Sequence, residues 1–186
     1  MSFSLLPRFL TPELTDLTPD FLLDKGIHLL MMDFDNTIVP YTTDVPTERM
    51  RFWLEEMNAS PVKIAIVSNS KNARLIRFCE TYHLDYIMRA HKPRPQGLQQ
   101  CMARFGFAPE QSAIVGDQIF TDTLAGNLAG VTPILVKAID NHTFWLKARH
   151  VLELPFVFAA RKRRIKTRKI WKSSCPCWMA RSTVCC

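Results

Sequence analysis

Four polar segments of the sequence carry side chains that could act together on a phosphate group. They are Asp33-Phe34-Asp35-Asn36-Thr37, Ser68-Asn69-Ser70, His91-Lys92-Pro93 and Gly116-Asp117-Gln118, the last followed by Asp122. Carboxylates such as those of Asp33 and Asp117 supply the oxygen ligands that Mg²⁺ prefers, usually one or two together with water and substrate phosphate. A lysine ammonium and a serine hydroxyl, here Lys92 and Ser68, can hold phosphate oxygens. These residue types therefore predict a site for a phosphate and a divalent cation.

The first segment holds two carboxylates, Asp33 and Asp35, with one residue between them. One carboxylate can attack phosphorus and form an aspartyl-phosphate. The other can protonate the leaving oxygen and later take a proton from the attacking water. Each segment alone has a simpler explanation, since an isolated Asp-x-Asp is commonly a solvated loop or a turn and Ser-Asn commonly caps a helix. Four such segments in order, each after a predicted strand, favour the chemical explanation.

The elements that must position these side chains are short apolar runs that alternate with amphipathic runs. A short apolar run predicts a strand, and an apolar spacing of three and four residues predicts a helix. Strands are expected over 27–33, 62–67, 85–88, 112–115 and 133–136, and helices over 47–57, 72–83, 95–105 and 121–129. The alternation indicates an α/β fold with a parallel sheet of about five strands. Right-handed crossovers bring the carboxyl ends of parallel strands to one edge, so the polar segments should meet there.

The four segments resemble the four motifs of the haloacid dehalogenase (HAD) superfamily. The matching stretches are LLMMDFDNTIV, IVSNS, the HKP around Lys92, and GDQIFTD. The resemblance implies a Rossmann-like three-layer α/β sandwich, a Mg²⁺ ion and hydrolysis through an aspartyl-phosphate. It implies that Asp33 is the nucleophile and that Asp35 is the general acid and base. The phosphate ligands that it implies are Ser68, Asn69 and Lys92. The metal ligands are Asp33, Asp117 and the backbone carbonyl of Asp35, and Thr37 and Asp122 have supporting roles.

The spacing of the motifs leaves no room for a cap domain. HAD enzymes that select small substrates insert a cap after the first motif or between the second and third. Here 33 positions separate Asp35 from Ser68 and 24 separate Ser68 from Lys92, and one helix and one strand fill each interval. A site without a lid is open to large substrates, such as a phosphate displayed on a macromolecule or a membrane.

Longer stretches resemble a narrower group, the capless class IIIA phosphatases of YqeG type. The matching stretches are LLP near the start, KPRPQGL after the third motif and AIVGDQIFTDTLAGNLAG around the fourth. This resemblance extends over about residues 5–150 and implies dephosphorylation of phosphatidylglycerophosphate to phosphatidylglycerol. The chain departs from the group after about residue 165.

The net charge of the 186-residue chain is +7, but the basic side chains are concentrated at one end. The last 28 positions, 159–186, hold nine basic side chains and no acidic one, whereas the remainder holds 15 basic against 17 acidic side chains. We therefore expect a phosphatase domain over 1–158, beginning with an irregular arm over 1–25, and a mobile basic tail over 159–186. A uniformly basic, DNA-binding surface is not expected. The nine basic residues are Arg161, Lys162, Arg163, Arg164, Lys166, Arg168, Lys169, Lys172 and Arg181.

The basic tail directly follows an apolar stretch, residues 151–160. Basic clusters beside apolar anchors bind anionic lipid surfaces, with about 1 kcal/mol for each Lys or Arg near the surface. A solvated tail that binds polyanions weakly and a tail that binds RNA or ribosomes are the alternatives, and charge alone does not separate them. The apolar residues of the N-terminal arm are expected to pack on the sheet, with membrane contact as the alternative.

The sequence shows neither a secretory signal nor an apolar run long enough to cross a membrane. We expect a cytoplasmic protein, or one peripheral on the inner face of a membrane, which would be the matrix side in a mitochondrion. Cys79 and Cys101 lie in predicted helices and are expected to be buried thiols. The spacing of the four cysteines in the tail does not fit a zinc site or a prenylation signal, and they stay unassigned. They are Cys175, Cys177, Cys185 and Cys186.

These observations favour a Mg²⁺-dependent phosphomonoester hydrolase that acts on phosphatidylglycerophosphate at a membrane surface. The first alternative is a phosphatase of the same fold for a nucleotide, a sugar phosphate or a phosphoprotein. The second alternative is a HAD-fold module without enzymatic activity that binds RNA or ribosomes through its tail.

Overall fold

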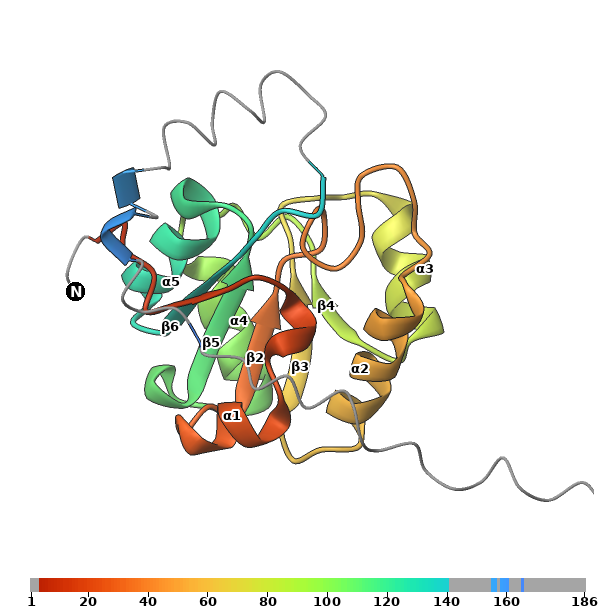
Figure 1. Ribbon diagram of the computed structural model, residues 1–186, viewed down its shortest axis with the longest axis horizontal. Coiled ribbons are helices and arrows are strands. Elements are labelled where there is room, and N and C mark those ends of the chain that lie inside the picture. Colours follow the sequence, from red (N-terminus) through yellow and green to blue (C-terminus); the bar gives the residue numbers. More distant parts are fainter. Residues whose placement is uncertain (1–3, 141–154, 157, 161–164, 166–186) are drawn as a thin grey trace, which may run out of the picture.

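The computed structural model describes residues 4–140, 155–156, 158–160 and 165, and contains one sheet of six parallel strands in the order β1-β6-β5-β2-β3-β4 (Figure 1). The strands are β1 (Phe9–Thr11), β2 (Leu29–Met32), β3 (Lys63–Val67), β4 (Asp85–Ile87), β5 (Ser112–Gly116) and β6 (Thr132–Val136). The helices are α1 (Pro19–Asp24), α2 (Glu48–Asn58), α3 (Ala73–Thr81), α4 (Gln96–Phe105) and α5 (Leu124–Ala129), with short helical turns η1 (Leu14–Asp16), η2 (Pro109–Gln111) and η3 (Ile119–Thr123). The predicted α/β fold is confirmed.

Helices cover both faces of the sheet. Alternate residues of each strand face opposite sides, and in β2 the apolar residues on both sides are buried. On one face Leu30 and Met32 of β2 belong to a core cluster with the buried residues of α1, α2 and α3. On the other face Leu29 and Met31 belong to a second cluster with the buried residues of α4 and α5. The two clusters make the three-layer sandwich that the family resemblance implied.

The N-terminal arm is more regular than predicted. Residues 1–25 were expected to be irregular, but β1 extends the sheet beside β6, with Phe9 opposite Ile134. Thr18 then caps α1 by accepting a hydrogen bond from the Phe21 amide, and Pro19 occupies the first helical turn. β1 was not among the strands expected from the sequence, which predicted about five strands where the structure has six. Phe9 packs against the core, as expected for the arm.

A second difference lies where one helix was expected over 121–129. The chain first makes the π-helical turn η3, in which the amides of Asp122 and Thr123 both donate to the Gln118 carbonyl, at 3.0 and 3.2 Å. The α-helix α5 begins only at Leu124. π-Helical turns are rare and are frequent at functional sites. This one sets the position of Asp122.

No cap domain interrupts the fold between the predicted motifs, since α2 and β3 account for the regular structure of 36–67 and α3 and β4 for that of 69–91. Within the ranges that the structure describes, no helix is both long and apolar enough to cross a membrane. Cys79 and Cys101 are buried free thiols, as predicted, and burial raises the pKa of each to about 12.

Most of the predicted basic tail lies outside the described residues, as do its four cysteines. Of the described residues near its start, Ala160 is buried, and the Ile165 amide donates a hydrogen bond of 2.9 Å to the carbonyl of Leu10. Ile165 also packs against the larger core cluster. The expectation of a mobile tail over 159–186 stays a prediction.

Candidate active site

The polar segments meet at the carboxyl edge of the sheet, as the predicted topology requires. The segment after β2 carries Asp33 and Asp35, and the loop after β5 carries Asp117. Here a cavity of about 410 Å³ opens, lined by Asp33, Asp35, Tyr41, Ser68, Asn69, Ser70, Lys92, Gln118, Thr121 and Asp122. Of the predicted site residues only Asp117 and Thr37 are outside this lining. Asp117 lies beside the cavity in the carboxylate cluster, and Thr37 lines a different groove on the side of α2.

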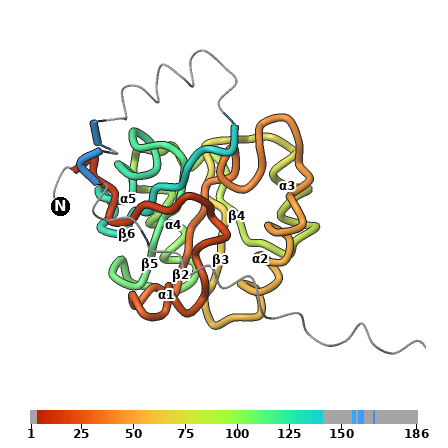
Figure 2. The backbone as a smooth tube through the Cα atoms, viewed as in Figure 1, coloured from red at the N-terminus to blue at the C-terminus, as the bar shows by residue number. Residues whose placement is uncertain are grey.

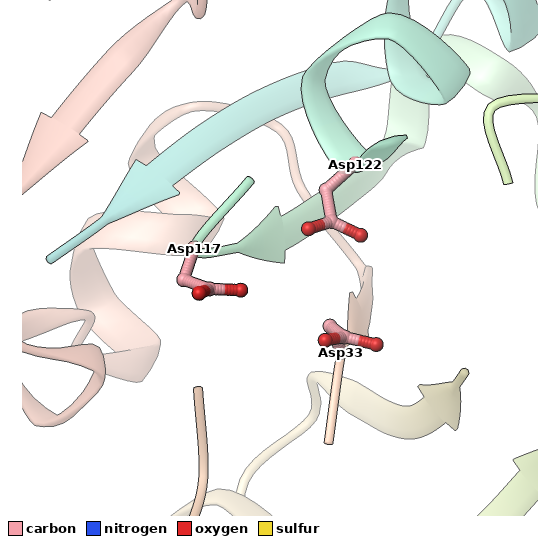
Figure 3. A group of neighbouring side chains, drawn as sticks. All are labelled: Asp33, Asp117 and Asp122. Atoms are coloured by element: carbon pink, nitrogen blue, oxygen red, sulfur yellow. The ribbon is translucent and has the colours of Figure 1, made fainter. Parts of the chain in front are cut away.

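The carboxylate cluster consists of Asp33, Asp117 and Asp122, whose side chains point toward one another (Figure 3). One carboxylate oxygen from each residue lies within 4.8 Å of the others. All three residues are buried, with at most 6% of their surface exposed. Three carboxylates at this separation in a buried place repel one another unless a cation balances them.

Lys92 supplies part of that positive charge. Its ammonium nitrogen lies 2.7 Å from Asp33 Oδ1 and 2.7 Å from Asp122 Oδ1. Burial alone would lower the pKa of the ammonium group, but the carboxylates of Asp122 and Asp33 outweigh burial and raise the pKa of Lys92 above its usual value. Lys92 is therefore a fixed cation beside the predicted nucleophile.

Asp122 is held against the sheet by the π-helical turn. Its Oδ2 accepts a hydrogen bond from the Gln118 amide at 3.2 Å, and its Oδ1 faces Lys92. A Cβ atom at Gly116 would lie 2.2 Å from Asp122 Oδ2, so only glycine at the end of β5 allows this approach. Burial raises the pKa of Asp122 to about 6, against the opposite effect of Lys92. Asp122 is thus the second carboxylate partner of Lys92, and the supporting role in the reaction stays a prediction.

Asn36 is a residue of the site for which the sequence predicted no role. Its side-chain amide donates to Asp117 Oδ2 at 3.3 Å and to the carbonyl of Asp140 at 2.7 Å, and its side-chain oxygen accepts from the Asp140 amide at 2.8 Å. Its backbone has a φ of 65°, in the left-handed region that asparagine tolerates better than most residues. Asn36, rather than Thr37, makes the hydrogen bonds that join the first loop to Asp117.

Arg74 is the second residue that was missed. Its guanidinium forms an ion pair with Asp35 Oδ1 and also donates to the carbonyls of Pro40, Tyr41 and Thr43, at 3.0, 2.7 and 2.9 Å. The loop after β2 therefore lies against the start of α3, as the backbone trace shows (Figure 2). Burial raises the pKa of Asp35, although Arg74 acts in the opposite direction. Arg74 fixes both the predicted general acid and the loop that follows it.

Asn69 and Ser68 lie where the sequence predicted, but the Asn69 side chain already has partners. Its amide donates to the Lys92 carbonyl at 2.9 Å, and its oxygen accepts from the Lys92 amide at 2.7 Å. Asn69 therefore fixes the backbone of Lys92 and is held beside the cavity rather than free to turn into it. The Ser68 hydroxyl accepts from the Ser70 amide at 3.2 Å and faces the cavity as well.

The chemistry of the carboxylate cluster fits a divalent cation. Three buried carboxylates face one lysine ammonium, and Asp35 is neutralised by Arg74, so the site has an excess of negative charge. Lys92 contacts Asp33 and Asp122, so Asp117 and the remaining oxygen of Asp33 are the donors best placed to hold an ion. Hard oxygen donors of this kind select Mg²⁺, Mn²⁺ or similar cations.

The chain matches the family model for haloacid dehalogenase-like hydrolases over residues 41–136, about half of its length. It is also 31% identical over 131 residues to the "Probable phosphatase YqeG" of Bacillus subtilis (strain 168), with 70% of this chain and 76% of that protein covered. The chain belongs to the haloacid dehalogenase-like hydrolase family. The model match contains Ser68, Lys92, Asp117 and Asp122 and begins after Asp33 and Asp35. The family resemblance, including that to the YqeG group, and the prediction of a phosphatase of this family are confirmed by these two matches.

The chain is also similar to solved structures of phosphatases. One is the cobalt-bound deoxy-D-mannose-octulosonate 8-phosphate phosphatase of Haemophilus influenzae, with a TM-score of 0.49, 12% identity, and 75% of this chain and 92% of that chain covered. Another is the 3-deoxy-D-manno-octulosonate 8-phosphate phosphatase of Yersinia pestis, with a TM-score of 0.48, 17% identity, and 74% and 84% covered.

We expect Arg74→Gln to lower kcat for an alkyl phosphate about 10- to 100-fold, because Asp35 would lose the group that orients it as a general acid. With p-nitrophenyl phosphate, whose leaving group needs no proton, the loss should be several-fold smaller. Arg77→Gln is the matched control, since Arg77 lies on the same helix and its ion pair with Asp44 is exposed. Equal losses on the two substrates would show that Arg74 does not act through Asp35.

Proposed function

We propose that this HAD-like hydrolase is a Mg²⁺-dependent phosphomonoesterase that forms an aspartyl-phosphate on Asp33. The observation that carries the proposal is the pairing of the buried Asp33 carboxylate with the Lys92 ammonium at 2.7 Å, next to the carboxylates of Asp117 and Asp122. A carboxylate in this setting is held in place, and the cation beside it can bind the oxygens of the phosphate that the carboxylate attacks.

The reaction has two steps. In the first, an Asp33 carboxylate oxygen forms a bond to phosphorus while the bond from phosphorus to the leaving oxygen breaks, and Asp35 donates its proton to that oxygen. In the second, Asp35 takes a proton from a water molecule, whose oxygen attacks phosphorus and releases inorganic phosphate and the Asp33 carboxylate. Ser68 and Lys92 hold the phosphate oxygens in both steps. The raised pKa of Asp35 suits a group that must first donate a proton.

Asp33 and Asp117, with the backbone carbonyl of Asp35, would hold Mg²⁺. The bound ion would supply positive charge that offsets the repulsion between the Asp33 carboxylate and a phosphate dianion.

We expect a chelator such as EDTA to abolish phosphate release and added Mg²⁺ to restore it. Asp117→Asn should raise the Mg²⁺ concentration needed for half-maximal activity by about 10- to 100-fold, because one charged ligand is lost while Asn36 can still hydrogen-bond to the side-chain oxygen. Titration of activity with Mg²⁺ measures this, with Asp44→Asn, outside the site, as the control. Full activity of the metal-free protein would contradict the assignment of the cluster.

The substrate that we propose is phosphatidylglycerophosphate. Within residues 4–140, no cap domain covers the cavity, and this supports access of a phosphate presented by a membrane lipid to Asp33. The basic tail can bind an anionic membrane surface. The long stretches of sequence that resemble the YqeG group support the same substrate, and they include the whole fourth motif. A protein that acts on this lipid would work in the cytoplasm or on the inner face of a membrane, or on the matrix side in a mitochondrion.

A substrate panel tests this choice. Phosphate release with Mg²⁺ is measured on vesicles that contain phosphatidylglycerophosphate and, separately, on nucleotides, sugar phosphates and a phosphoprotein, with Asp33→Asn as the control. The proposal predicts the highest kcat/KM on the lipid. Good activity on one of the other substrates and none on the lipid would favour a phosphatase for a nucleotide, a sugar phosphate or a phosphoprotein. No activity on any substrate would favour an RNA- or ribosome-binding module.

The role of the tail is tested by replacing its nine basic residues with glutamine. This keeps Ala160 and Ile165, which contact the folded domain and would be lost in a deletion. Because each basic residue near an anionic surface contributes about 1 kcal/mol, the loss of turnover on vesicles should exceed the loss on p-nitrophenyl phosphate by at least about tenfold. A sedimentation assay with the same vesicles measures binding directly. Equal losses on both substrates would count against docking through the tail.

A further inference from the structure

A second cavity, of about 640 Å³, adjoins the catalytic one. It is lined by Asn69, Lys71, Arg89, His91, Lys92 and Arg94, and no acidic residue lines it. Asn69 and Lys92 line both cavities, so the two are neighbours. The other four residues come from the loops after β3 and β4, at the edge of the sheet that β4 forms. We call this second cavity the basic pocket.

Lys92 of the basic pocket is paired with Asp33 and Asp122, but three other cations of the pocket differ from most arginines of the described residues in lacking an acidic partner. Within the described residues, neither Arg89, Arg94 nor Lys71 forms an ion pair. Five other arginines each lie within 4 Å of an Asp or Glu oxygen, namely Arg49, Arg51, Arg74, Arg77 and Arg104. Like charges gathered around a concave surface repel one another, and an anion bound among them relieves that repulsion.

The backbone of the loop after β4 is strained and firmly held. Arg89 and His91 both have φ in the left-handed region, 52° and 56°, which costs about 1 kcal/mol or more for such residues. Ala90 between them donates to the Ser68 carbonyl at 3.1 Å, and a Cβ atom at Gly97 would lie 2.6 Å from the Ala90 Cβ. The loop is thus fixed to the phosphate-binding strand end on one side and to α4 on the other. Strain that is retained in this way is typical of functional sites.

We propose that the basic pocket binds a second, unreacting phosphate of the same substrate molecule. The inference rests on the proposed function and narrows its substrate class to phosphomonoesters that also carry a phosphodiester or a further phosphate a few bonds away. The reacting phosphate is held at Ser68 and Lys92, and the rest of the substrate can then extend along Asn69 and Lys92 to Arg89 and Arg94. A guanidinium can hold two phosphate oxygens at once, so these two arginines would be the principal ligands.

The test compares two soluble substrates that differ by the second phosphate. One is glycerol 3-phosphate, and the other is the deacylated headgroup of phosphatidylglycerophosphate, which carries a phosphomonoester and a phosphodiester on one glycerol. Because neither needs a membrane, a charged vesicle surface cannot produce the effect. We expect the wild-type protein to have a kcat/KM at least about tenfold higher on the substrate with two phosphates, as charge-assisted hydrogen bonds would give.

The variant Arg89→Gln/Arg94→Gln should lower kcat/KM about tenfold more on the substrate with two phosphates than on glycerol 3-phosphate, mainly through KM. Arg94→Gln alone, which does not alter a strained position, should give part of the same difference. The matched control Arg8→Gln/Arg51→Gln removes two exposed charges elsewhere and should not change the ratio.

A wild-type protein without preference for the second phosphate, or variants that lose activity equally on both substrates, would overturn the inference. Neither result touches the proposed function, which fails on different evidence, namely phosphate release that persists in Asp33→Asn. A loss that appears only on vesicles and not on the deacylated substrate would mean that the pocket contacts neighbouring lipids, and would also overturn the inference.

Discussion

Asp33→Asn is expected to lower kcat by at least about 10⁴-fold on every substrate that the wild-type protein hydrolyses. An amide does not attack phosphorus, and loss of a catalytic nucleophile costs this much or more in enzymes that form a covalent intermediate. Asparagine has nearly the same shape as aspartate and keeps a side-chain oxygen for Lys92, so the variant should fold. Phosphate release under excess enzyme measures the residual rate.

The matched control for this substitution is Asp24→Asn. Asp24 is exposed at the end of α1, and its ion pair with Lys25 is also exposed, so activity should stay at the wild-type level. If Asp33→Asn retained a tenth of the wild-type activity while its melting temperature was unchanged, Asp33 would not be the nucleophile.

Of the substitutions proposed for this protein, Lys92→Met should have the largest effect on stability. We expect it to lower the free energy of unfolding by about 3–5 kcal/mol. Methionine fills nearly the same space as lysine. Because it carries no charge, the buried carboxylates of Asp33 and Asp122 would lose their common partner. Phosphate binding would be lost as well, so activity should fall with stability. Urea unfolding in the absence of divalent cations measures the free energy.

Lys63→Met is the matched control for Lys92→Met. The Lys63 ammonium lies 2.8 Å from Asp85 Oδ2, about as close as Lys92 lies to its partners, but the Lys63 side chain is 42% exposed. Exposed pairs contribute about 1 kcal/mol or less. If the two substitutions lowered the free energy of unfolding equally, the Lys92 cluster would not have the buried electrostatic character that we assign to it.

Much of the sheet and the site followed from the sequence, because both depend on local patterns. The strand before Asp33 and the helix with Met50, Trp53, Leu54 and Met57 on one face are evident from the spacing of apolar residues. Once the strands are known, parallel topology alone brings Asp33, Ser68, Lys92 and Asp117 to one edge. The short strand β1 and the π-helical turn around Asp122 have no such pattern, so neither was predicted.

The contacts of Asn36 and Arg74 could not be predicted for a different reason. Arg74 meets Asp35 across 39 positions of sequence, and Asn36 meets Asp117 across 81. Such pairings depend on how loops fold over the ends of strands, and a single sequence does not show how the loops fold. The one signal available was the residue type of Asn36, since asparagine after the paired carboxylates suits a left-handed turn. The hydrogen bonds by which the Asn69 side chain fixes the Lys92 backbone could likewise not be predicted before the fold was known.

Phosphate is expected to pass through a covalent bond to Asp33, and acid-quench trapping can capture that bond. Wild-type protein is mixed with Mg²⁺ and a hydrolysed substrate, quenched in acid within the first turnover, digested and analysed by mass spectrometry. We predict one phosphoryl group on Asp33 in the peptide that contains β2, and its removal by hydroxylamine, which cleaves acyl phosphates. A phosphoryl group on another residue, or rapid phosphate release with no labelled peptide, would show that Asp33 is not the nucleophile.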